Sequence, residues 1–171
     1  MTHLKTDTRA RLHEAVNFVL GILMMVFAGT AIAQVEVANS VAKVETYVDK
    51  QGVAQRRLVN ADSVVPGDEL RYTISFTNSG EGEVDAGSIV ITNPVPQSTE
   101  YIDGTAFGAG TEILFSADQG VTFELGEKLK VLKQGEEEIA SAKEYTTIQW
   151  QFLSALEPGE TGQVSFNVKL K

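Results

Sequence analysis

The clearest structural signal in the sequence is the run Glu69-Leu70-Arg71-Tyr72-Thr73-Ile74-Ser75-Phe76-Thr77-Asn78. Its apolar side chains alternate with polar ones. Successive side chains of a β-strand point to opposite faces of a sheet, so a period of two predicts a strand with one buried and one solvated face. The segment 164–171 repeats this alternation, and Trp150 and Phe152 alternate with polar residues in the segment 147–153.

Shorter strands are predicted between these long ones, at 41–48, 53–59, 88–92, 99–102, 112–115 and 121–125. Turns separate the strands, because proline presets φ and glycine readily adopts a positive φ. The predicted turns are 49–52, Pro66-Gly67-Asp68, 79–82, 93–96, Asp118-Gln119-Gly120 and Pro158-Gly159-Glu160.

This pattern predicts an all-β fold, an immunoglobulin-like antiparallel β-sandwich of about seven to nine strands. No segment is typical of a crossover helix. The one helical candidate, 136–143, lacks an apolar stripe and is interpreted as a solvated excursion with one helical turn. The predicted core residues are Tyr72, Ile74, Phe76, Trp150, Phe166 and Val168.

Residues 1–33 have the pattern of a signal peptide. A basic start with Lys5, Arg9 and Arg11 precedes an apolar run at 15–28, and an Ala-x-Ala step ends at Ala33. We therefore expect cleavage between Ala33 and Gln34 and export to the periplasm or the extracellular space. An uncleaved membrane anchor is the alternative, but the apolar run is shorter than the roughly 20 residues that usually span a bilayer.

Beyond the predicted signal peptide, the sequence divides into an N-terminal strand or hairpin extension at 34–57 and an immunoglobulin-like domain at 58–171. No second apolar run of membrane length occurs in the sequence, so no membrane span is expected after cleavage.

The chain is acidic. It contains 14 basic and 23 acidic residues, of which three basic and two acidic ones lie in residues 1–33, so the remainder has 11 basic residues, 21 acidic residues and a formal charge of −10. Such a charge repels phosphate backbones and disfavours nucleic acid as a partner.

The residue types outside the signal peptide exclude most catalytic chemistry. Both histidines, His3 and His13, lie in the signal peptide, and the sequence has no cysteine. Nucleophilic sites built on histidine or cysteine and the usual zinc sites are therefore excluded. The sequence predicts a non-enzyme with no catalytic, cofactor-binding or metal-binding residues, although a pair of carboxylates could still support hydrolysis.

The segment Ser116-Ala117-Asp118-Gln119-Gly120-Val121-Thr122-Phe123 resembles the Asp-box of sialidases and other β-proteins. The structural interpretation is a hairpin in which Asp118 accepts backbone N–H bonds, Gly120 has a positive φ and Phe123 packs beneath. A single box favours this structural role over catalysis.

Calcium is the remaining ligand candidate, because it needs only oxygen donors. Turn aspartates could supply them, although such residues usually bond their own backbone. The candidates are Asp62, Asp68, Asp103 and Asp118. A Lys–Asn crosslink at Asn78 is disfavoured, because the available lysines are predicted to face outward. These are Lys43, Lys130 and Lys169.

Several motifs, in order, are similar to the bacterial surface "conserved repeat" domain, or domain of unknown function eleven. They cover roughly residues 58–171, with Asn93 where the family usually has aspartate. The matching residues are Pro66-Gly67-Asp68, Leu70, Tyr72, Ile74, Asn78, Gly80, Asn93-Pro94-Val95-Pro96, Trp150, Leu156, Pro158, Gly159, Val164, Phe166 and Val168. The resemblance implies an immunoglobulin-like sandwich in an envelope or extracellular setting, and it carries over no catalytic residues.

The sequence thus favours an exported, non-catalytic structural or protein-binding domain whose partner is another envelope or surface protein. Its oligomeric state stays open. A carbohydrate-binding module is the main alternative, because Trp150 and Tyr72 could stack on sugars if they were exposed. A carboxylate-pair hydrolase is the more distant one.

Overall fold

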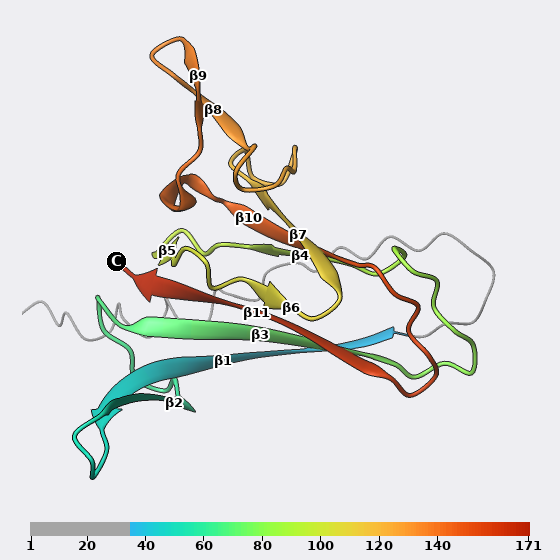
Figure 1. Ribbon diagram of the computed structural model, residues 1–171, viewed down its shortest axis with the longest axis horizontal. Coiled ribbons are helices and arrows are strands. Elements are labelled where there is room, and N and C mark those ends of the chain that lie inside the picture. Colours follow the sequence, from blue (N-terminus) through green and yellow to red (C-terminus); the bar gives the residue numbers. More distant parts are fainter. Residues whose placement is uncertain (1–34) are drawn as a thin grey trace, which may run out of the picture.

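The computed structural model describes residues 35–171, which form two packed antiparallel sheets and a projecting hairpin (Figure 1). The predicted all-β sandwich is confirmed. The predicted cleavage site at Ala33 and Gln34 lies outside the described residues. Within 35–171, no helix has the length and apolar character needed to cross a membrane.

The larger sheet has the strand order β2-β1-β3-β11-β5, with β6 also paired to β11. The smaller sheet has the order β4-β10-β7, and β8 pairs only with β9. The bounds are β1 Val35–Val48, β2 Ala54–Asn60, β3 Glu69–Asn78, β4 Val90–Pro94, β5 Thr99–Tyr101, β6 Phe107–Gly108, β7 Thr111–Ser116, β8 Lys130–Lys133, β9 Glu136–Ile139, β10 Thr147–Phe152 and β11 Thr161–Leu170.

The core lies between the two sheets and is centred on Trp150, whose exposed fraction is 0 %. Its ring lies 5.9 Å from that of Phe166 on the facing sheet. Tyr72 is only half-buried, and its ring stacks on Phe166 at 5.1 Å. Gly162 is required for close packing, because a Cβ there would lie 2.1 Å from the Phe76 ring. Ile74 and Val168 are also buried.

The strand predictions hold where the alternation is long. β3 has the predicted bounds, and β10 and β11 agree within a few residues. The predicted strand at 121–125 is wrong, since this segment makes a single bridge, between Glu124 and Phe115. The Asp-box turn brings Glu124 beside β7, but the chain then leaves the sheet.

The interpretation of 136–143 needs a correction. Residues Glu136–Ile139 form strand β9, and only Ala142–Glu144 form a 3₁₀ turn. Two features stabilise the β8–β9 hairpin. Gln134 and Gly135 both have a positive φ, 53° and 91°, as a tight two-residue hairpin turn requires. Lys130 also pairs with Glu137 across the hairpin at 2.9 Å.

The two sheets differ in width, and this leaves one part of the larger sheet uncovered. Val35 and Val37 at the start of β1 pack against the core. No residue of β1 or β2 is itself buried, although β3, β5 and β11 all contribute buried residues. The later part of β1 and the whole of β2 therefore lie at the margin of the core, and we call residues 41–60 the β1–β2 arm. Residues 41–44 of the arm still pair with β3, and beyond them only β1 and β2 continue.

The packing of Trp150 generates the first prediction. Trp150→Ala should destabilise the protein by about 3–5 kcal/mol, because it removes a fully buried side chain and leaves a cavity. The wild-type emission should be blue-shifted and poorly quenched by acrylamide, and it reports on this residue alone because the chain has one tryptophan. Urea unfolding measures the loss, with exposed Leu153→Ala as the control. Emission resembling free tryptophan would contradict the assigned core.

Candidate functional site

The β1–β2 arm is built on a tight turn with capped backbone groups. Asp49 Oδ1 accepts hydrogen bonds from the backbone N–H groups of Gln51 and Val53, both at 2.9 Å. Gly52, with φ of 81°, donates its N–H to the Asp49 carbonyl at 3.0 Å. This is a three-residue loop with a glycine bulge, a common hairpin connection, and it fixes the register of the arm. The pKa of Asp49 is lowered, first by its bond from Val53.

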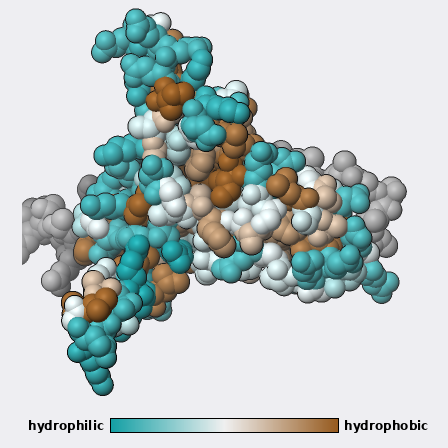
Figure 2. Space-filling model, viewed as in Figure 1, coloured by the Kyte–Doolittle hydropathy of each residue, from teal (hydrophilic) through white to brown (hydrophobic). Residues whose placement is uncertain are grey.

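Apolar side chains are exposed on both faces of the arm. Val48 and Leu58 lie on one face with exposed fractions of 67 % and 50 %, and Tyr47 lies on the other at 43 %. In Figure 2 the arm is the lower-left projection, and hydrophobic atoms show among its hydrophilic ones. A free surface of this kind is typical of a site that another molecule covers.

Both arginines of β2 bend back over the sheet. The Arg57 guanidinium pairs with Glu45 of β1 at 3.0 Å, and it lies 5.3 Å from the centre of the Tyr47 ring. Arg56 crosses over β1 to pair with Glu69 of β3. Exposed ion pairs of this type add little stability. The two pairs do, however, fix where the guanidinium groups lie. Both groups point back over the sheet and not outward from the edge of β2.

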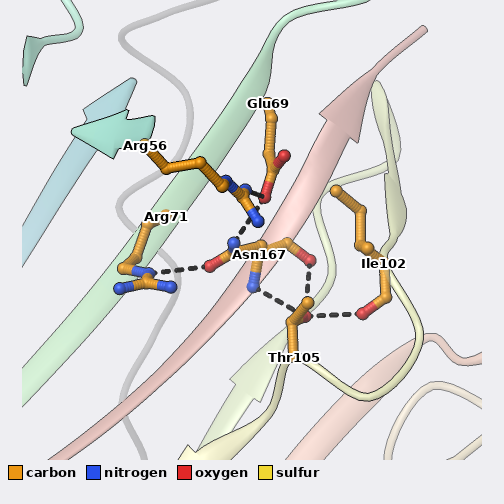
Figure 3. A network of polar contacts seen from close by, with 6 residues as sticks. All are labelled: Arg56, Glu69, Arg71, Ile102, Thr105 and Asn167. Atoms are coloured by element: carbon orange, nitrogen blue, oxygen red, sulfur yellow. Dashed lines mark hydrogen bonds and ion pairs between the residues drawn. The ribbon is translucent and has the colours of Figure 1, made fainter. Parts of the chain in front are cut away.

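Figure 3 shows the polar network that receives Arg56. Asn167 of β11 donates its side-chain N–H to Glu69 and accepts a bond from Arg71 Nε at 2.9 Å. The backbone N–H of Asn167 donates to Thr105 Oγ1 at 3.0 Å, which ties the β5–β6 connection to the sheet. The network therefore links the arm, the central strands and the opposite edge.

The burial of Asn167 differs from what its position in the strand predicts. The alternation in β11 places it on the solvated face, yet its exposed fraction is 1 %. Charged neighbours and a crossing loop bury it there, and its hydrogen bonds compensate for the burial. The alternation of residues along a strand cannot predict the burial of Asn167, because the residues that bury it are distant in the sequence.

Within residues 35–171, no strand pairs with the outer edge of β2. The bond from Asp49 N–H to the Val53 carbonyl, at 2.9 Å, sets which residues of β2 face β1. Hydrogen-bonded and non-bonded pairs alternate in an antiparallel ladder, so Gln55, Arg57 and Val59 bond to β1. The N–H and C=O groups that point away from the sheet belong to Ala54, Arg56, Leu58 and Asn60.

Lys43 was predicted to face outward, and this is wrong. It lies opposite buried Leu70 and is half-buried, with its Nζ 2.8 Å from Asp68. Asp68 also accepts the N–H of Val65 in the turn formed by Pro66 and Gly67. Lys130 and Lys169 are exposed.

Buried Asn78 has its amide fully engaged. It donates to the carbonyls of Gly82 and Leu156 at 2.7 and 2.9 Å and accepts the N–H of Gly80 at 3.0 Å. Asn78 thus anchors the loop after β3, and no lysine is among its hydrogen-bond partners. The nearby Pro158-Gly159 turn closes when Gly159 donates to the Asn78 carbonyl at 2.7 Å.

The Asp-box is a capped hairpin turn. Asp118 Oδ1 accepts bonds from the Ser116 hydroxyl at 2.7 Å and from the N–H groups of Val121 and Thr122 at 3.1 and 2.9 Å. Asp118 Oδ2 accepts the Thr122 hydroxyl at 2.6 Å. Gly120 has φ of 86°, and a Cβ there would lie 3.6 Å from the Phe123 ring. These bonds, led by that from Ser116, hold the pKa of Asp118 well below its usual range.

The carboxylates are engaged as hydrogen-bond acceptors. Asp49 and Asp118 each cap a turn through two or more bonds. Asp68 accepts one bond from the Val65 N–H in its turn and one from Lys43 on β1. Every carboxyl group with a resolved shift has a lowered pKa, including Glu144, whose bonds from Lys133 and Ser141 lower it to about 2. A general acid would need the opposite shift. Residues 35–171 contain no group of three or more side chains placed to hold a metal ion.

An open groove of about 500 Å³ lies at the end of the sandwich where β4 leads into β5. Tyr101 and Tyr145 line it but are buried, and burial raises the pKa of both hydroxyls. Its charged rim is already paired, since Lys143 lies 3.1 Å from Glu100. Lys171 Nζ donates to the Gln97 carbonyl at 3.0 Å. The groove therefore offers few free polar groups to a ligand.

Comparison with known proteins adds no relative, because no family model, curated protein or solved structure matches the chain. The resemblance to the conserved repeat domain stays a prediction. The candidate site consequently rests on geometry alone, and the β1–β2 arm is the feature that best fits a binding role.

The Asp-box generates the second prediction. Asp118→Ala should lower the urea midpoint at neutral pH, because it leaves turn donors unsatisfied, and Asp118→Asn should recover part of the loss. A carboxyl whose pKa is lowered by folding stabilises the fold above its ordinary pKa, and this contribution is lost as the pH falls toward the lowered pKa. The difference between wild type and Asp118→Ala should therefore shrink on acidification.

Asp103→Ala, in another exposed turn, is the control and should be neutral. Two results would contradict the structural role of Asp118. One is an unchanged midpoint in Asp118→Ala. The other is a calcium-dependent gain in wild type that Asp118→Ala abolishes.

Proposed function

We propose that the chain is an exported, non-catalytic domain of the cell envelope or extracellular space that binds another protein. One observation carries this proposal. Within residues 35–171 the β1–β2 arm has no buried residue, and it exposes Tyr47, Val48, Val53 and Leu58. Soluble domains seldom leave a strand of a sheet open on both faces and one edge unless it has a partner.

The chemistry of the remaining surface also favours binding over catalysis. The segment after the predicted signal peptide has no histidine or cysteine, and its shifted carboxyls are strong acceptors held ionised. The export pattern of residues 1–33 supports an envelope or extracellular location, and the resemblance to a bacterial surface domain agrees with it.

No specific observation favours carbohydrate binding. Trp150 is buried, and Tyr72 is half-buried against Phe166. Two aromatic side chains are exposed in residues 35–171, Tyr47 on β1 and Phe107 on β6. These strands are separated by β3 and β11, so the two rings do not form one stacking platform.

Site-specific photocrosslinking tests the proposed function. Tyr47 and Leu58 are replaced, one at a time, by p-benzoylphenylalanine in the chain as the producing cell exports and processes it. We expect illumination of intact cells to give a covalent adduct with an envelope or surface protein from both positions. Leu153, which has a comparable exposed fraction of 57 % and lies outside the arm, is the matched control.

The pattern of adducts decides the outcome. Adducts from the arm and none from Leu153 support the proposal. Absence of protein adducts at Tyr47 and Leu58, or equal labelling at Leu153, contradicts it. Retention of the protein on an envelope polysaccharide without any protein adduct would favour the carbohydrate-binding alternative.

A further inference from the structure

We infer that the outer edge of β2, which is unpaired within residues 35–171, binds an extended, acidic segment of a partner protein by strand addition. This inference rests on the proposed function and names the surface and the chemistry of the partner. In strand addition, the bound segment continues the ladder of the sheet, and backbone hydrogen bonds supply the affinity.

The backbone of β2 presents the hydrogen-bonding groups that strand addition requires. Its outward groups, on Ala54, Arg56, Leu58 and Asn60, form an unbroken row along a strand with no proline. Natural sheets usually protect such an edge with a bulge, a covering loop or charged side chains. Here the two arginines that could protect it are drawn back toward Glu69 and Glu45.

One exposed apolar side chain of the arm, that of Leu58, lies where an added strand would cover it. Leu58 is on the edge strand itself, and Val48 lies on the same face opposite Ala54. A neighbouring strand sits about 4.8 Å away and places alternate side chains on each face. An incoming segment with apolar residues on one face would therefore reduce the exposed area of Leu58.

Charge complementarity selects an acidic partner. Residues 50–60 contain Lys50, Arg56 and Arg57 and no acidic residue. Each guanidinium has five N–H donors, and the ion pairs with Glu69 and Glu45 leave some of them available for a second carboxylate. Two long stretches, 72–127 and 144–168, contain no lysine or arginine and repel acidic segments. Between them, Lys130, Lys133 and Lys143 are each paired with a glutamate. An acidic segment is thus steered toward the arm.

A second copy of the chain is a poorer occupant of this edge. Twofold pairing centred on Arg56 or Arg57 places identical cations directly opposite each other, which is destabilising. Pairing centred on Leu58 places Arg57 of one copy diagonal to Arg57 of the other. β2 should therefore pair more favourably with a strand of different sequence than with β2 of a second copy.

A proline substitution isolates the backbone contribution. The N–H of Arg56 points away from β1, so Arg56→Pro removes an outward donor without removing a β1–β2 hydrogen bond. Arg56→Ala is the matched control, because it loses the same side chain and keeps the N–H. Leu58→Pro and Leu58→Ala form a second pair at the next outward position.

The probe is a capped, fluorescein-labelled peptide of alternating valine and glutamate, and its binding to the exported protein is followed by anisotropy. Wild type should bind it, and Arg56→Ala should bind a few-fold more weakly. Arg56→Pro should bind about tenfold or more weakly than Arg56→Ala. Added salt should slow association. Tryptophan emission verifies that the core of each variant is folded, and the Leu58→Pro and Leu58→Ala pair repeats the comparison at an independent position of the arm.

Three results would overturn the inference. They are equal binding by the proline and alanine variants at both positions, equal binding of a valine–lysine peptide, and a wild-type dimer that Arg56→Pro converts to monomer. The last result would assign the edge to a second copy. If photocrosslinks from Tyr47 persist in Arg56→Pro while the peptide result is negative, the proposed function stands and strand addition alone is wrong.

Discussion

The unequal width of the two sheets is the constraint on which the rest of the structure depends. Three strands, β4, β10 and β7, face a larger sheet whose central path has five strands. Buried apolar contact is the main favourable term in folding, so the core forms only where both sheets overlap. Trp150 and Phe166 occupy this overlap, and the β1–β2 arm extends beyond it.

The arm must therefore be stabilised by means other than burial. Its turn is fixed by Asp49 and Gly52, and its strands are held by the ladder between β1 and β2. The ion pair of Arg56 with Glu69 reaches the network around Asn167 and so connects the arm to the central strands. A two-stranded ribbon is marginal in water by itself, but β3 continues the sheet on the other side of β1.

Local alternation was sufficient to predict the sandwich and the strands that form its core. β3, β10 and β11 each have one face against the opposite sheet, so the period of two in their sequences reports directly on burial. The Asp-box turn was also predictable, because Ser116, Asp118 and Gly120 act on groups within a few residues.

The features that define the candidate site could not be predicted from local alternation. Asn167 has the alternation of a solvated residue, and distant residues bury it. The glutamates of β9 suggested a helical turn, although Gln134-Gly135 is a hairpin signal that could have corrected this. The open edge of β2 depends on which strand lies next to it, and strand order is set by contacts that are remote in sequence.

Within residues 35–171, β2 is an edge strand that bonds to β1 on one side only, and amide hydrogen exchange resolved by residue measures this arrangement. We expect alternating protection in the free protein. The amides of Gln55, Arg57 and Val59 should exchange slowly, and those of Ala54, Arg56 and Leu58 should exchange rapidly. Uniform protection along β2 would mean that the edge is already covered, and uniformly fast exchange would mean that the arm does not form; either result would contradict the account.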